Sequence, residues 1–144
     1  MENEPLSKLK EISTALEVYD ALADPALVQQ ILDVLPDALL IADIAGRICM
    51  VNQQLELLFG YPRSMLLGEK FDILLPPEVR ERHTGHFEQY FENPTVRPMN
   101  SSKALSGIRR DGREVKVQIS LGPIVSGRGM LGLALIRRVV HAPG

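Results

Sequence analysis

The sequence contains one cysteine, no tryptophan and no strong excess of either charge. Because Cys49 stands alone, the chain can form neither an internal disulfide nor a multi-cysteine metal site, which fits a reducing compartment. A formal net charge of -2 at pH 7 gives no electrostatic reason to bind nucleic acid or an anionic membrane. No apolar run is long enough to cross a bilayer, and no signal-peptide pattern follows Met1. We therefore expect a cytoplasmic protein without nucleic-acid or membrane partners.

Motifs that support catalysis are also missing. The chain has no phosphate-binding glycine loop, no paired-carboxylate motif and no activated nucleophile, and no three ligands have the spacing of a zinc site. We therefore expect no enzymatic activity and no catalytic residues.

An alternating pattern near the C-terminal end predicts a strand with one face on a core. Polar and apolar residues alternate over residues 114–121, where the apolar ones are Val115, Val117, Ile119 and Leu121. The preceding Asp111-Gly112 is typical of a type I′ hairpin turn, in which both central residues have positive φ. Residues 104–110 are then the partner strand.

A two-residue loop would fix the register of this hairpin. Ser106 would face Val117, and Ala104 would face Ile119. The first strand would therefore present small side chains to the core, which leaves space there for a ligand.

The N-terminal segment predicts an amphipathic helix over residues 6–22. Its apolar stripe recurs at helical spacing and consists of Leu9, Ile12, Leu16 and Tyr19. The stripe is available to pack on the sheet of the same chain or on a second copy of the chain, and we expect a homodimer that uses it. A second helix begins at Pro25 and ends before Pro36.

Three further strands are predicted from short apolar runs. Residues 38–43 and 47–51 form a hairpin, and residues 130–136 form the last strand. The first and last of these strands are apolar on both faces, so they belong at the centre of a sheet covered on both sides. The N-terminal helices are expected to cover the second face.

Helices fill the region between the two hairpins. Asn52 is expected to cap a helix over residues 53–59, and a longer helix is expected over residues 78–92. His83 shares a face of this longer helix with Val79, Phe87 and Tyr90, and we expect it to point toward the core.

The order of these elements resembles the layout of a PAS domain. Residues 28–140 are similar to the bacterial sensory-box pattern in an ordered set of short segments: Leu35-Pro36-Asp37-Ala38, Asp43 with Gly46, Val51-Asn52, Leu58-Phe59-Gly60-Tyr61, Leu67-Gly68, Leu75-Pro76, Arg82-His83, Arg97-Pro98-Met99 and Gly107-Ile108-Arg109-Arg110-Asp111-Gly112. The resemblance implies an α+β fold with a five-stranded antiparallel sheet in the order 2-1-5-4-3. Helices would lie on one face and the N-terminal amphipathic helix on the other. The expected organisation is a helical extension (1–27), a PAS domain (28–140) and a tail (141–144).

The resemblance also implies a ligand pocket between the longer helix and the concave face of the sheet. The residues expected to line it are Ile41, Leu58, Phe71, Leu74, Val79, His83, Phe87, Met99, Ala104, Ser106, Val117 and Ile119. Domains of this family sense small molecules, redox state, gas or light, and they regulate a kinase, cyclase or transcription regulator in the same or another chain. The alternative function is ligand-free dimerisation.

The last strand departs from the sensory-box pattern at its end. Many of these domains end this strand with an Asp-Ile-Thr signature, whereas this chain has Ile136-Arg137-Arg138. The departure favours the N-terminal helix as the element that transmits the signal.

The resemblance also has implications for flavin and haem binding. Light-oxygen-voltage domains carry an Asn-Cys-Arg motif where this chain has Lys70-Phe71-Asp72, so flavin is not expected, and Cys49 is expected to be a small core or sheet residue. His83 falls where haem-binding PAS domains place the proximal ligand, and Met99 where a distal ligand can arise. Since Arg82-His83 also occurs in domains without haem, haem-based gas or redox sensing through His83 is the third hypothesis.

Overall fold

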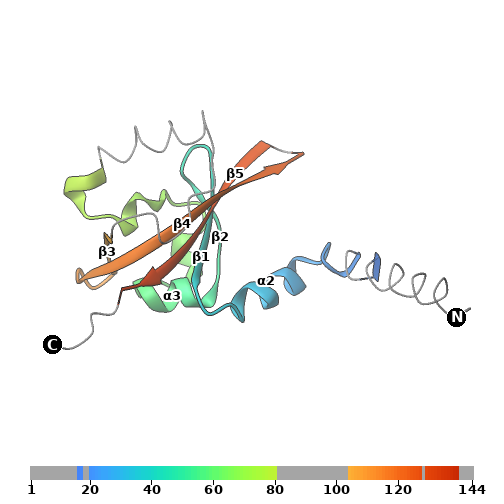
Figure 1. Cartoon of the computed structure of the whole chain (residues 1–144), viewed down its shortest axis with the longest axis horizontal. Helices are drawn as coiled ribbons and strands as arrows, with labels where there is room; N and C mark the ends of the chain where they lie inside the picture. The colour runs from blue at the N-terminus through green and yellow to red at the C-terminus, as the bar shows by residue number, and fades with distance from the viewer. Residues whose placement is uncertain (1–15, 18–19, 81–103, 128, 140–144) are drawn as a thin grey trace, which may run out of the picture. The chain divides into compact units, whose positions relative to one another are not determined.

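The computed structural model describes residues 16–17, 20–80, 104–127 and 129–139. The chain forms two compact units, residues 1–34 and residues 35–144, and Figure 1 shows the elements of each. Leu16, Glu17, Asp20 and Ala21 are helical, and the other residues of the predicted N-terminal helix up to Tyr19 lie outside the described part of the chain.

The first unit ends with α2 (Pro25–Asp33), which confirms the second predicted helix. The Asp24 carboxylate accepts a hydrogen bond from the Ala26 N–H (3.0 Å) and caps the helix, and Pro25 takes a position where no N–H is needed. One turn further on, Gln29 Nε2 donates to Asp33 Oδ1 (3.0 Å). The Asp24 cap and Pro25 therefore define where α2 begins.

The second unit is built on a five-stranded antiparallel sheet in the predicted order, β2-β1-β5-β4-β3. Its strands are β1 (Ala38–Asp43), β2 (Ile48–Val51), β3 (Leu105–Ile108), β4 (Glu114–Ser126) and β5 (Gly129–Arg138). β5 is the central strand and β1 lies next to it, so the two strands with apolar residues on both faces occupy inner positions, as predicted. Coverage of the second face by the N-terminal helix stays a prediction.

The β3–β4 hairpin differs by one residue from the predicted register. Gly107 pairs with Val115, and Ser106 pairs with Lys116 instead of Val117. A one-residue shift moves every side chain of a strand to the other face of the sheet. The prediction that Ser106 faces the core is therefore wrong.

The turn of this hairpin explains the shift. The Arg109 N–H donates to the Arg113 carbonyl (2.8 Å), so the loop has three residues, and the Gly112 N–H donates to the Arg109 carbonyl (2.9 Å). Gly112 has φ 88°, whereas no described residue other than glycine has positive φ. A type I turn followed by a left-handed glycine matches this geometry. The type I′ prediction was wrong because Asp111 does not take positive φ; its carboxylate instead accepts the Arg113 N–H (2.9 Å).

Short helices connect β2 to the later strands and cover one face of the sheet. They are α3 (Gln53–Phe59), α4 (Arg63–Leu66) and the 3-10 helix η1 (Phe71–Leu74). α3 packs against β1, α4 against β2 and η1 against β3. Residues 77–80 are helical, at the start of the longer helix predicted over 78–92, and the other residues of that predicted helix lie outside the described part of the chain. No helix in the described ranges is both long and apolar enough to span a bilayer.

We predict that Gly112→Val lowers the free energy of unfolding by about 1–2 kcal/mol, because a β-carbon in left-handed backbone crowds the following carbonyl. Nothing lies within 4 Å of a β-carbon built at Gly112, so packing adds no penalty. Chemical denaturation measures the loss. Gly112→Asn is the matched control, since asparagine tolerates this conformation and should lose much less. Equal losses in the two variants would contradict the backbone explanation.

Candidate functional site

The face of the sheet that carries the short helices holds one continuous apolar cluster. Leu55 and Phe59 of α3, Leu74 of η1 and Val117 of β4 are each 4% exposed or less, and they pack with residues from β1, β2 and β5. Protein interiors of this kind are close-packed and resist changes in volume. These residues therefore form a closed floor for any ligand on this face.

A set of partly accessible apolar side chains packs against this floor. We name it the apolar rim, and it consists of the half-buried residues that pack against the cluster: Leu58, Tyr61, Phe71, Ile73, Ile119 and Ala134. Apolar area that is still partly exposed gains free energy when a ligand covers it, by about 25 cal/mol for each Å² removed from water. The apolar rim is therefore the part of this face suited to contact a small apolar or amphipathic molecule.

The structure brings five of the predicted pocket residues into this one cluster. They are Leu58, Phe71, Leu74, Val117 and Ile119, which come from α3, η1 and β4. Val79 is half-buried in the helical segment 77–80 and is not a member of the cluster.

Three predicted pocket residues lie elsewhere. Ile41 takes the opposite face of β1 from its neighbours Leu40 and Ala42, because successive strand residues alternate and only those neighbours belong to the cluster. Ala104 is exposed just before β3. Ser106 lies on the outer face of the β3–β4 hairpin, which corrects its predicted position.

The remaining predicted site residues fall mostly outside the described chain. His83, Phe87 and Met99 of the predicted pocket and Leu9, Ile12 and Tyr19 of the predicted dimer stripe are among them. Leu16, the fourth residue of the stripe, has 62% of its surface exposed. Their roles stay predictions.

The contact between Phe59 and Gly107 was missed by the sequence reasoning. The Phe59 ring lies directly over Gly107 of β3, where an ideal β-carbon would be 2.8 Å from Phe59 Cε1 and 3.4 Å from the Leu74 carbonyl oxygen. Glycine inside a strand is a known signal of close approach by another group. That signal was present at Gly107, and it explains how α3 and η1 both reach this edge of the sheet.

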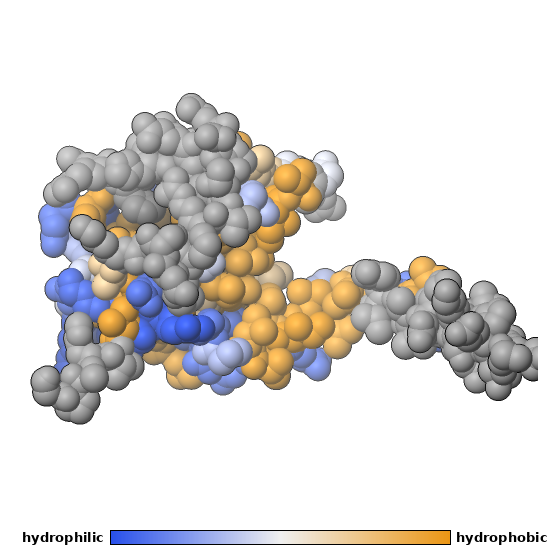
Figure 2. All heavy atoms as spheres, viewed as in Figure 1, coloured by the Kyte–Doolittle hydropathy of each residue, from blue (hydrophilic) through white to orange (hydrophobic). Residues whose placement is uncertain are grey.

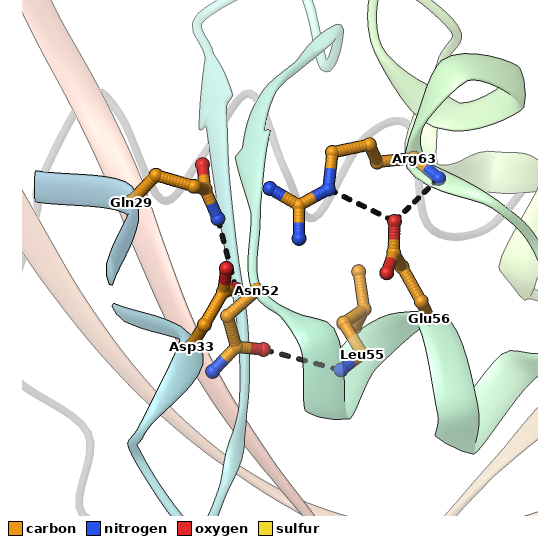
Figure 3. A network of polar contacts seen from close by, with 6 residues as sticks. All are labelled: Gln29, Asp33, Asn52, Leu55, Glu56 and Arg63. Carbon is orange, nitrogen blue, oxygen red and sulfur yellow. Dashed lines mark hydrogen bonds and ion pairs between the residues drawn. The ribbon is translucent and has the colours of Figure 1, made fainter. Parts of the chain in front are cut away.

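Asn52 fixes α3 above the sheet. Its side chain is fully buried, and Oδ1 accepts hydrogen bonds from the Leu39 N–H (2.8 Å) and the Leu55 N–H (3.1 Å), the second of which is drawn in Figure 3. Its Nδ2 donates to the Asp37 carbonyl (2.9 Å). The predicted capping role is confirmed, and the same side chain also anchors β1.

The other end of α3 is held by polar contacts as well. Glu56 Oε1 accepts from the Arg63 N–H and from Arg63 Nε (2.9 Å), which ties α3 to α4 (Figure 3). Arg109 Nη1 donates to the Leu58 carbonyl (2.7 Å), and the Arg110 N–H donates to the Phe59 carbonyl (2.8 Å). Carbonyl groups that a helix end leaves unpaired are thus satisfied by the β3–β4 hairpin.

Charged residues gather on the outer side of this hairpin. Figure 2 shows hydrophilic residues at the end of the sheet near β3, on the left, and hydrophobic residues along β5 toward the upper right. The Lys116 ammonium and the Ser106 hydroxyl hydrogen-bond to Glu114 and lower the pKa of its carboxyl group. Because successive strand residues alternate, these side chains lie on the opposite face of the sheet from Val115 and Val117, which belong to the apolar cluster.

Reactive and metal-binding groups are sparse in the described ranges. No group of three or more His, Cys, Asp or Glu side chains there is placed to hold a metal ion. Cys49 lies in β2, as predicted for a sheet residue, but it is exposed and does not belong to the core. Partial burial, with a smaller effect of the Asp43 charge, raises the pKa of its thiol, which disfavours the reactive thiolate.

Comparison with known proteins identifies the class of domain. The sequence model described as the PAS fold matches residues 26–139, most of the chain. The chain therefore belongs to the PAS family, as its motifs predicted.

Two curated relatives are bacterial sensors. The chain is 29% identical over 99 residues to the sensor protein FixL of Bradyrhizobium diazoefficiens, and the aligned segment covers 69% of this chain and 20% of that protein. It is 25% identical over 127 residues to the oxygen sensor protein DosP of Escherichia coli, and this aligned segment covers 88% of this chain and 15% of that protein. The chain thus spans a fifth or less of the length of these relatives.

A solved structure confirms the fold. The PAS domain of an HTR-like protein from Haloarcula marismortui aligns with a TM-score of 0.60 and 21% sequence identity, covering 79% of this chain and 96% of that one. At this identity the match establishes the fold alone.

We predict that Gly107→Ala lowers the free energy of unfolding by about 1–3 kcal/mol, because the added methyl group overlaps the Phe59 ring and a packed core cannot expand without cost. Thermal or urea unfolding measures this loss. The matched control is Gly122→Ala in β4, where a β-carbon meets nothing within 4 Å. If both variants lose the same stability, the close approach of Phe59 is not the cause.

Proposed function

We propose that this domain is a sensory PAS module that binds a small apolar or amphipathic ligand against the apolar rim and regulates a signalling effector. The observation that supports this most is the combination of a closed floor, Leu55, Phe59, Leu74 and Val117, with half-buried apolar side chains around it. Binding sites for small molecules are mostly apolar and largely preformed. The similarity to two bacterial sensors supports the signalling role.

The effector is a kinase, cyclase or transcription regulator in the same or another chain. The matched relatives are several times longer than this chain, which supports an attached output domain. We also propose that the domain itself is not an enzyme and that flavin is not its ligand.

The ligand proposal is tested by native mass spectrometry of the full chain as purified. The wild type should carry a small-molecule mass, and Ala134→Phe should lose it, because a large ring would cover apolar surface of the rim that the ligand would contact. Thermal unfolding of this variant should be retained. Ala45→Phe in the exposed β1–β2 turn is the matched control and should keep the mass. A clean mass for the unliganded wild type would contradict ligand binding.

Haem-based oxygen sensing is the second candidate, supported by the similarity to a protein named as an oxygen sensor. The described apolar rim suits the apolar body of a porphyrin, and His83 would supply the iron ligand. A haem mass in the same mass spectra would favour this candidate over other ligands. The visible absorption spectrum should then show a Soret band, and His83→Ala should abolish both signals.

Dimerisation through the N-terminal helix is proposed as part of either function or as the sole function of a ligand-free domain. The exposed side chain of Leu16 supports it, since a large apolar residue on a helix surface is available for a partner. We predict that Leu9→Glu with Leu16→Glu converts a dimer into a folded monomer, measured by sedimentation. A dimer unchanged by both substitutions would place the interface elsewhere.

A further inference from the structure

The two ends of the sheet domain are joined by one ion pair. Arg137 Nε donates to Asp37 Oδ1 (3.1 Å) and Arg137 Nη2 donates to Asp37 Oδ2 (3.0 Å), so both carboxylate oxygens are engaged across 100 positions of sequence. Two parallel hydrogen bonds fix the direction as well as the distance of the two side chains. We name this pair the Asp37–Arg137 clasp.

The clasp lies where the chain enters and leaves the sheet. Asp37 immediately precedes β1 and follows the end of the first unit at Val34 by three residues. Arg137 is the penultimate residue of β5. Ala38 pairs with Ile136, so Asp37 and Arg137 are the next residues along these two strands and lie opposite each other. The clasp therefore joins the end of β5 to the segment that immediately precedes β1.

The backbone around the clasp is held on both sides. The Asp37 carbonyl accepts from Asn52 Nδ2 (2.9 Å), which ties it to the start of α3. Beyond Arg137, the Val139 N–H donates to the Lys116 carbonyl of β4 (2.9 Å). The clasp thus joins two anchored pieces of backbone through their side chains.

The residues beside the clasp reach the candidate site. Ile136 precedes Arg137 in β5, is 6% exposed, and pairs with Ile119 of the apolar rim on β4. Ala134, another residue of the rim, lies two positions further back on the same face of β5. Arg137 follows Ile136 directly but lies on the opposite face of β5, so the backbone of β5 connects the rim to the clasp.

We propose that the Asp37–Arg137 clasp couples packing at the apolar rim to the segment that links the N-terminal unit to the sheet. This inference rests on the proposed sensory function and names the contact by which the occupied site acts on the N-terminal output element. The Arg137 side chain in this pair is 60% exposed, so the pair is weak enough to be altered by a small shift of β5.

The first test is residue-resolved amide hydrogen exchange on the full chain. Arg137→Gln should speed exchange of the Leu39 amide about two- to fivefold, the range expected for loss of an exposed ion pair. The Ile48 amide, bonded to Glu69, should be unaffected and serves as the internal reference. The matched variant Arg138→Gln removes the same charge one residue away and should leave Leu39 unchanged. The reversed pair, Asp37→Arg with Arg137→Asp, should restore slow exchange.

The second test perturbs the rim without needing the ligand. Ile119→Val removes one methyl group from the rim and should speed Leu39 exchange relative to Ile48 in the otherwise wild-type chain. In the double variant with Arg137→Gln, it should add nothing beyond the effect of Arg137→Gln alone, because the connection is already broken. Additive effects, or no effect of Arg137→Gln on Leu39, would overturn the proposal. Ligand detection by mass spectrometry is independent of this result, so the two proposals fail separately.

Discussion

The buried side-chain amide of Asn52 is the interaction on which this domain depends. Its oxygen and nitrogen together bond to Leu39 in β1, to Leu55 in α3 and to Asp37 ahead of β1. Each buried polar group left without a partner would cost about 1–3 kcal/mol, so an apolar residue of similar size cannot take this place. One side chain therefore fixes where the first strand starts and how the first covering helix lies on it.

The position of α3 then determines the opposite edge of the sheet. With its first turn held by Asn52, its last residues reach β3, where Phe59 covers Gly107 and the Phe59 carbonyl accepts the Arg110 N–H. Gly107 has to face inward for this contact, which requires the three-residue turn instead of the shorter turn that Asp111-Gly112 favours. Tertiary packing thus overrides the local preference of the hairpin, and it sends Ser106 to the outer face.

The sequence was sufficient for features that depend on local pattern. Strand positions and the capping of α3 by Asn52 were predicted from local pattern, and the order of the sheet followed from the resemblance to the PAS family. Leu58, Phe71 and Val117 were predicted to line a ligand pocket; the structure places them in one apolar cluster, and their contact with a ligand stays a prediction. Features set by contacts distant in sequence were not. The register of β3 depends on Phe59, about fifty positions away, and a run of apolar residues such as 38–42 does not reveal which face Ile41 takes. The Asp37–Arg137 pair spans 100 positions and gave no local signal.

The contacts that hold the domain are unevenly distributed over the sheet. On the side of α3, Asn52, the Glu56–Arg63 pair and the Arg109 hydrogen bond to Leu58 fix the covering helices at several points. By contrast, Ile119 on β4 and Ala134 on β5, which belong to the apolar rim, are only half-buried. Since tightly packed regions resist displacement and less buried ones yield first, a ligand at the rim would move β4 and β5 more readily than α3. One of these strands, β5, carries Arg137 as its penultimate residue, next to the point where the chain enters the sheet.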